Sequence, residues 1–215
     1  MIKIAPSLLA ADYLKLGDEI RRMAEAGADY LHYDVMDGCF VPNITFGQGV
    51  AKRAATCGLP VDAHLMIVNP GKYLERFAAE GVSMLSFHLE AAGEDTEELL
   101  GRVRSLGMKA GLAINPDVPV ENLFPYLGSL DYVLIMSVFA GFGGQKFIEG
   151  TLDRIRTVKR EIRRRKLNVL IEVDGGIGPN NAPALSEAGA DILVAGSSVF
   201  KAPDPDEAIR YIRVT

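Results

Sequence analysis

The sequence predicts a (β/α)8 barrel formed by a single domain of residues 1–215, and three observations favour this fold. Short runs rich in Ile, Leu, Val, Met or aromatic residues alternate along the chain with segments of helical periodicity. Eight such runs occur in 215 residues, a length that suits eight strand–helix units. No linker or low-complexity tract divides the chain. The alternative is an open doubly wound sheet, but Pro6-Ser7-Leu8-Leu9-Ala10 after the first strand contains none of the glycines of a GxGxxG turn.

The predicted elements follow from these runs in order. The strands are expected at residues 3–8, 30–36, 61–67, 84–89, 109–115, 132–138, 169–174 and 192–195. Helices are expected at 14–25, 71–80, 96–106, 152–166, 182–188 and 206–211. Gly27, Gly81, Gly107 and Gly189 follow four of these helices, and glycine just after a helix is a common stop signal.

Composition and charge exclude several classes of function. The formal net charge of -5 offers no basic surface for nucleic acid. The longest apolar run, residues 132–138, is too short to span a bilayer, and the first residues do not resemble a secretory signal. The two cysteines, Cys39 and Cys57, form no CxxC motif and favour a reducing compartment. We therefore expect a cytoplasmic protein that binds neither nucleic acid nor membranes.

Histidine and aspartate side chains share one face of neighbouring strands. His32 and Asp34 lie two residues apart on one strand and His64 lies on the next, and residues two apart in a strand point to the same side. Asp174 ends the seventh strand, and the strand ends of a barrel meet at one rim. Two imidazoles and two carboxylates suit one divalent metal ion: Zn, Fe, Mn or Co. The third histidine, His88, lacks such a pairing and is expected to support the site or the fold.

The two aspartates suggest a reaction. Strands two and seven lie three positions apart in a closed ring of eight, so Asp34 and Asp174 would face opposite sides of a bound molecule. Carboxylates on opposite faces of a carbon acid suit proton removal on one side and proton return on the other, which inverts a stereocentre. A metal between them would polarise the adjacent carbonyl and stabilise an enediolate. Alternatively, both are metal ligands only, or Asp174 serves the turn Asp174-Gly175-Gly176.

Three methionines, Met36, Met66 and Met136, also lie near strand ends. Their thioethers are suited to line the reacting carbon and contact an enediolate while excluding water. Packing as ordinary core side chains is an equally good explanation.

Glycine-rich loops follow the last three strands. They are Gly141-Phe142-Gly143-Gly144, Gly175-Gly176 and Gly196-Ser197-Ser198. Backbone N–H groups in such turns approach anions closely, and a phosphate site after strands seven and eight recurs in this fold. No lysine or arginine is evident beside these loops. We therefore predict a phosphate cradle that relies on backbone dipoles.

The sequence resembles the ribulose-phosphate 3-epimerase family through motifs that span nearly the whole chain in the family's order. The motifs are Ile4-Ala5-Pro6-Ser7, HYDVMDGCFVPN at 32–43, DAHLM at 62–66, Met136-Ser137-Val138, GFGGQ at 141–145, EVDGGI at 172–177 and Ala195-Gly196-Ser197. The resemblance implies interconversion of D-ribulose 5-phosphate and D-xylulose 5-phosphate in the pentose phosphate pathway or carbon fixation. It also implies a homo-oligomer, which is usual in the family.

The resemblance further implies the role of each site residue. A divalent metal would bind His32, Asp34, His64 and Asp174, with Asp34 as proton acceptor and Asp174 as proton donor. The substrate would bind Ser7, His64, Gly141, Phe142, Gly143, Gly144, Gly175, Gly176, Gly196 and Ser197. One alternative is a hexulose phosphate such as D-allulose 6-phosphate, which Gly-Phe-Gly-Gly in place of Gly-Phe-Ala-Gly disfavours. Another is a non-catalytic sugar-phosphate-binding barrel, which the presence of both aspartates and both histidines opposes.

Three positions depart from the family's pattern. Phe139-Ala140 stands where Asn-Pro is common, Cys39 where His is frequent and Gln48 where Pro is frequent. A missing proline frees the backbone φ angle and changes loop rigidity. We expect the loop after the sixth strand to differ in its dynamics or specificity.

Overall fold

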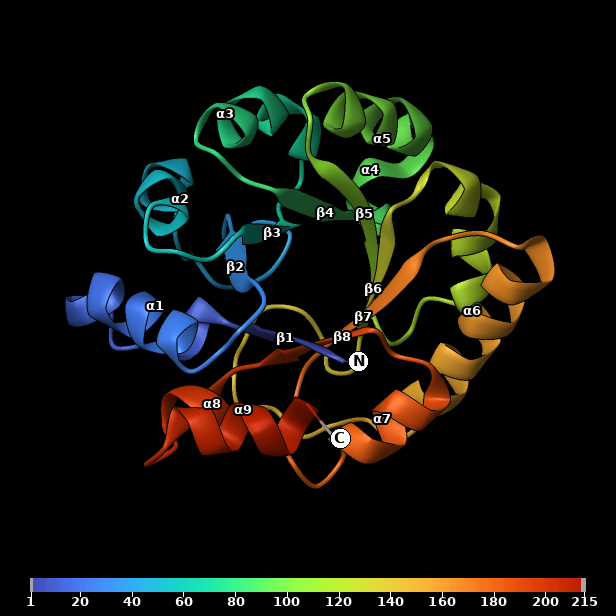
Figure 1. Cartoon of the computed structure of the whole chain (residues 1–215). Helices are drawn as coiled ribbons and strands as arrows, with labels where there is room; N and C mark the ends of the chain where they lie inside the picture. Colours follow the sequence, from blue (N-terminus) through green and yellow to red (C-terminus); the bar gives the residue numbers. More distant parts are fainter. Residues whose placement is uncertain (1, 214–215) are drawn as a thin grey trace.

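Eight parallel strands form the inner layer of the computed structural model, which describes residues 2–213 (Figure 1). They are β1 (Lys3–Pro6), β2 (Leu31–Met36), β3 (Val61–Met66), β4 (Met84–His88), β5 (Lys109–Ile114), β6 (Tyr132–Met136), β7 (Leu170–Asp174) and β8 (Ile192–Ala195). Hydrogen-bonded neighbours follow the order β1-β8-β7-β6-β5-β4-β3-β2, and a parallel bridge between Ser7 and His32 brings the chain after β1 alongside β2. The predicted (β/α)8 barrel is confirmed.

Helices surround this layer on the outside (Figure 1). They are α1 (Leu16–Glu25), α2 (Gln48–Ala55), α3 (Leu74–Ala79), α4 (Leu89–Ala92), α5 (Thr96–Ser105), α6 (Thr151–Arg165), α7 (Ala182–Ala188), α8 (Ser197–Phe200) and α9 (Pro205–Arg213). Between β5 and β6 the outer element is the 3-10 segment η5 (Val120–Ser129), which contains Pro125. Proline removes a backbone donor and opposes a regular α-helix there.

The differences between predicted and observed elements have local causes. The prediction missed α2, whose buried side chains are only Ala51 and Ala54, so its apolar periodicity is weak. Several strands end one or two residues earlier than predicted. Leu8 and Val138, which lie beyond two of these strand ends, are nevertheless buried. An apolar run therefore marks burial more faithfully than it marks the last hydrogen-bonded residue of a strand.

The predicted glycine stops are confirmed, and Gly27 shows how each returns the chain to the barrel. Gly27 has a φ of 84°, and the N–H of the next residue, Ala28, donates to the carbonyl of Met23. This pairing closes the helix end in the left-handed conformation that glycine adopts without strain. The Asp29 carboxylate then accepts a hydrogen bond from the backbone N–H of Ile4 on β1. The helix end and the neighbouring strand are thereby joined.

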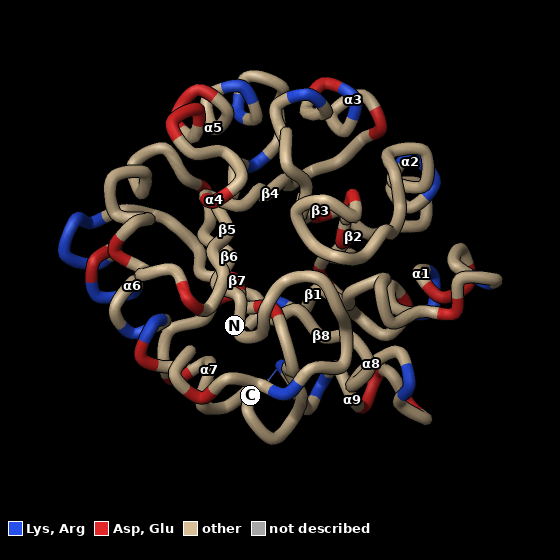
Figure 2. The backbone as a smooth tube through the Cα atoms, turned by 180° about the vertical axis from the view of Figure 1, so that it is seen from behind, with Lys and Arg blue, Asp and Glu red and all other residues tan. Residues whose placement is uncertain are grey.

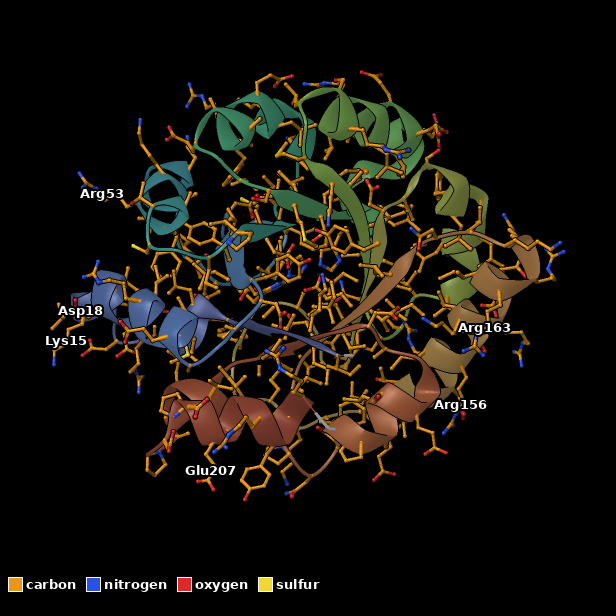
Figure 3. All side chains as sticks on the ribbon, viewed as in Figure 1. Lys15, Asp18, Arg53, Arg156, Arg163 and Glu207 are labelled. Carbon is orange, nitrogen blue, oxygen red and sulfur yellow. The ribbon has the colours of Figure 1, made fainter. Side chains whose placement is uncertain are left out.

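The alternation of side chains along the strands separates two environments. Leu31, Tyr33 and Val35 of β2 pack in the apolar layer between strands and helices, whereas His32 and Asp34 are buried on the opposite face, inside the barrel. Charged residues are otherwise concentrated on the outer helices (Figure 2). The labelled Arg156, Arg163 and other charged residues of Figure 3 project outward from the ribbon. No helix within residues 2–213 has the length and apolar character needed to cross a membrane.

Candidate active site

A cavity of about 560 Å³ opens among the loops that follow the strands. Most of the predicted substrate-binding residues line it, together with both aspartates and all three methionines. These residues are Ser7, Asp34, Met36, Met66, Met136, Gly141, Phe142, Gly143, Gly144, Asp174, Gly175, Gly176, Gly196 and Ser197. His32 and His64 are fully buried and are not among the lining residues, so their side chains lie beneath the surface of the cavity.

The four predicted metal ligands converge below this cavity. The register of β2 and β3 places Asp34 beside His64, and Asp174 comes from β7. Nε2 of His32 lies 3.4 Å from Asp34 Oδ1 and 3.9 Å from Asp174 Oδ2. Nδ1 of His64 lies 3.3 Å and 4.0 Å from the same two oxygen atoms. One donor atom from each residue falls within 4.8 Å of all the others, a grouping that would hold a single ion.

An unpartnered nitrogen supports the same interpretation. Nε2 of His32 is buried and has no hydrogen-bond partner within residues 2–213. Its other ring nitrogen, Nδ1, lies 2.8 Å from Asp62 Oδ2, and the Tyr132 hydroxyl donates to Asp62 Oδ1 over 2.9 Å. Asp62 is the acceptor for the proton on Nδ1, so Nε2 is the ring nitrogen that faces the carboxylates of the cluster. A buried nitrogen in this position fits a divalent cation, which would take the place of a proton there.

A second carboxyl group lies under His32. Glu172 is fully buried and its Oε1 is 3.6 Å from Nδ1 of His32. Burial and the nearby charge of Asp62 raise the pKa of Glu172 well above its usual range, which favours its protonated form.

The two aspartates of the cavity have opposite electrostatic environments. Burial alone would raise the pKa of Asp34, but His32 and His64 hold it well below its usual range. Ser7 also donates a hydrogen bond to Asp34 over 2.6 Å. Burial and the charge of Asp34 instead raise the pKa of Asp174 to about 7. At neutral pH in the metal-free protein, Asp34 is ionised and Asp174 is close to half protonated.

The glycine loops come together as predicted, and Gly176 shows why a side chain is excluded. Its φ is 64°, and a Cβ at this position would lie 2.6 Å from the backbone nitrogen of Phe147. The loop after β7 thus packs directly on the loop after β6.

The expectation that no cation lies beside the cradle was wrong, because Lys201 lines the same cavity. Its N–H donates to the carbonyl of Ser197, so one helical turn returns this lysine to the glycine-rich end of β8.

The three methionines are both buried in apolar clusters and part of the cavity lining. Met36 and Met66 are paired in register on β2 and β3, and each of the three methionines is almost completely buried. Met36 and Met66 pack with Val41, whereas Met136 packs with Leu134 and Val138. They complete small apolar clusters and at the same time line the cavity beside the two aspartates.

Comparison with known proteins decides the family. Residues 3–200 match the model of the ribulose-phosphate 3 epimerase family. The chain belongs to the ribulose-phosphate 3-epimerase family. Among its relatives, the ribulose-phosphate 3-epimerase of Synechocystis is 48% identical over 99% of this chain and 93% of its own. The Bacillus subtilis ribulose-phosphate 3-epimerase is 47% identical over 99% of both chains.

Solved structures of low sequence identity share the fold alone. KGPDC from Streptococcus mutans superimposes with a TM-score of 0.72 at 12% identity, covering 99% of this chain and 95% of its own. Tryptophan synthase of Mycobacterium tuberculosis also gives a TM-score of 0.72, at 13% identity, covering 100% of this chain and 93% of that one. These matches support the (β/α)8 barrel and carry no information on the reaction.

The departure from the family pattern at Phe139-Ala140 has a structural counterpart. The Ala140 N–H donates to Asn115 Oδ1 over 3.0 Å, a bond that proline could not make. The Gln145 side chain donates to the carbonyls of Phe139 and Phe142. Hydrogen bonds thus restrain the loop where the family commonly uses the proline ring. Phe139 is 51% exposed and lines the cavity, whereas the two other departures, Cys39 and Gln48, do not line it.

The role of Glu172 escaped the sequence analysis. Glu172 precedes the predicted ligand Asp174 by two residues, so strand alternation alone could have placed it on the same inner face. The contact of Tyr132 with Asp62 and the contact of Asn115 with His88 join segments that are far apart in sequence. Those contacts depend on the register between strands, which the sequence pattern does not specify.

Proposed function

We propose that this chain is a metal-dependent isomerase that interconverts D-ribulose 5-phosphate and D-xylulose 5-phosphate by inverting C3. The observation that carries this proposal is the pair of aspartates, Asp34 and Asp174, which line one cavity with opposite pKa shifts above a histidine cluster. Membership of the ribulose-phosphate 3-epimerase family supports the same activity.

His32, Asp34, His64 and Asp174 would together hold one divalent ion. Their donor atoms converge, and the combination of imidazole and carboxylate suits Zn, Fe, Mn or Co. When bound, the ion would polarise the substrate carbonyl next to C3 and offset negative charge on the substrate oxygens. Asp62 would keep Nε2 of His32 available by accepting the proton on Nδ1.

Asp34 and Asp174 would transfer the proton. Asp34, ionised and oriented by the Ser7 hydroxyl, removes the proton from C3 of D-ribulose 5-phosphate and leaves an enediolate. Asp174, which retains a proton near neutral pH, returns a proton to the opposite face and gives D-xylulose 5-phosphate. The reverse reaction exchanges the two roles. Met36, Met66 and Met136 would contact the enediolate and keep water away from it.

The phosphate group would lie against the glycine-rich loops. Gly141, Phe142, Gly143, Gly144, Gly175, Gly176, Gly196 and Ser197 would contact the substrate, as would Ser7 and, by family resemblance, His64. Backbone N–H groups of these turns would face the phosphate, and Lys201 would add a full positive charge. Lys201 is the only lysine or arginine among the cavity-lining residues of the described chain.

The biological setting is part of the proposal. The reaction would belong to the pentose phosphate pathway or carbon fixation, and the enzyme would work as a homo-oligomer in the cytoplasm without nucleic-acid or membrane partners. One relative, from Oryza sativa, is described as a cytoplasmic isoform and is 41% identical over 98% of this chain.

A side-by-side assay tests the function. Chelator-treated protein and protein reloaded with Zn²⁺, Mn²⁺, Co²⁺ or Fe²⁺ are assayed with D-ribulose 5-phosphate and D-allulose 6-phosphate. We expect turnover of the pentulose phosphate that requires an added ion, with a lower kcat/KM for the hexulose phosphate. A preference for allulose 6-phosphate would favour the alternative substrate. Binding of both sugars without turnover under any metal condition would favour a non-catalytic barrel.

A further inference from the structure

A chain of polar contacts leads away from the ligand cluster on the outer side of His64. Nδ1 of His64 faces the cluster, at 3.3 Å from Asp34 Oδ1, and its Nε2 lies 2.9 Å from Nε2 of His88. The two rings stack with their centroids 5.0 Å apart, and both are fully buried. Nδ1 of His88 then lies 3.5 Å from Glu90 Oε1. The proposed acid–base chemistry makes no use of His88 or Glu90.

The protons on this pair of rings have only two consistent arrangements. Two neutral imidazoles carry two N–H protons, and one of these must join the two Nε2 atoms because both would otherwise be buried without a partner. The other proton lies either on His64 Nδ1, where Asp34 accepts it, or on His88 Nδ1, where Glu90 accepts it. Only the second arrangement leaves a lone pair on His64 Nδ1 that a metal ion can use.

The surroundings of Glu90 favour this second arrangement. Asn115 directs both its backbone N–H, at 3.0 Å, and its side-chain N–H, at 2.9 Å, to Glu90 Oε1. The orientation of the Asn115 amide is set by the Ala140 N–H, which donates to its oxygen. Burial alone would raise the pKa of Glu90, but the contacts with His88 and Asn115 lower it, so the group is an anionic acceptor at neutral pH. The ring of Phe40 also packs against His88, with the ring centroids 4.8 Å apart.

We propose that Glu90 is a positioning residue which, through His88, selects the tautomer of His64 that can bind the metal. This inference rests on the proposed metal-dependent function. Asn115 holds Glu90 in place and, through its hydrogen bond with Ala140, connects Glu90 and His88 to the loop that follows β6. Asp62 has the equivalent position for His32, so each ligand histidine has its own acceptor on the side away from the cluster.

The substitution Glu90→Gln tests the proposal with little change in shape. A glutamine amide can donate to His88 Nδ1, which stabilises the arrangement with a proton on His64 Nδ1. Glu94→Gln is the matched control, because Glu94 is exposed on the adjacent segment and makes no hydrogen bond within the described chain. Zn²⁺ affinity is measured on all three proteins by competition with a chelator of known affinity. We expect Glu90→Gln to weaken Zn²⁺ binding by about tenfold to hundredfold and Glu94→Gln to leave it unchanged.

Imidazole NMR supplies a readout that a merely structural role would not change. The chain contains three histidines, so long-range ¹H–¹⁵N spectra resolve each ring tautomer. In chelator-treated protein we expect Glu90→Gln to shift His64 toward the Nδ1–H form relative to wild type and relative to Glu94→Gln. Wild-type affinity and tautomers in Glu90→Gln would overturn the inference while leaving the function intact. A wild-type protein that neither binds Zn²⁺ nor epimerises D-ribulose 5-phosphate would instead overturn the proposed function.

Discussion

Replacing Asp174 with asparagine should make the metal-free protein more stable while removing its activity. Burial and the charge of Asp34 raise the pKa of Asp174 from 3.8 to about 7, so the folded state resists ionisation of this group. Protonated Asp174 contributes to the unfolding free energy. This contribution is fully present below about pH 4 and is lost as the pH rises through 7. The change in pKa, at about 1.36 kcal/mol for each pH unit, sets an upper limit of about 4 kcal/mol on this loss. Asparagine is close in shape and is never ionised, so it avoids the loss.

Urea unfolding of chelator-treated protein at pH 4.5, 6 and 8 measures the effect. We expect Asp174→Asn to exceed wild type in unfolding free energy by about 2–4 kcal/mol at pH 8 and to approach wild type at pH 4.5. Zn²⁺ should reverse the order, because the variant lacks one anionic ligand. A difference that does not depend on pH, or a less stable variant at pH 8, would refute the argument that Asp174 is held protonated by its surroundings.

Three further predictions concern turnover and substrate binding. Asp34→Asn should lower kcat by about 10²–10⁴-fold in a Zn²⁺-loaded coupled assay while the circular dichroism spectrum is retained; substantial activity would remove Asp34 as the base. Gly176→Ala should raise KM, because its Cβ would lie 2.6 Å from the backbone nitrogen of Phe147. Gly150→Ala is the control and should leave KM unchanged, because the space around Gly150 is open. Equal KM values for the two variants would contradict the close packing of the glycine-rich loops around the phosphate. Lys201→Gln should raise KM with little change in kcat, and the difference should shrink in high salt; a salt-independent effect would argue against a contact between charges.

Strand alternation accounts for most of what could be predicted. A period of two along β2 and β3 places His32, Asp34 and His64 on the inner face whatever the exact ends of the strands. Closure of eight strands then brings Asp174 to the same rim. The convergence of these four candidate ligands was therefore predictable before any distance was known. The short helix α2 was not, because two buried alanines give almost no apolar periodicity.

The remaining site features depend on contacts between strands that are far apart in sequence. Nothing in the local pattern around Tyr132 or Asn115 says that these residues approach Asp62 or Glu90. Lys201 was overlooked for a different reason. It follows the glycine-rich loop by one helical turn, and the short helix α8 that returns it to the cavity was not predicted.

Hydrogen exchange at C3 in heavy water tests the two-aspartate mechanism most directly. Zn²⁺-loaded Asp174→Asn and Asp34→Asn are each incubated in heavy water with D-ribulose 5-phosphate or D-xylulose 5-phosphate, and deuterium at C3 is followed by NMR. We predict that Asp174→Asn exchanges the C3 hydrogen of D-ribulose 5-phosphate only, that Asp34→Asn exchanges that of D-xylulose 5-phosphate only, and that neither variant epimerises its substrate. Substantial epimerisation by either variant, or exchange of both sugars by one of them, would contradict a site in which each aspartate serves one face.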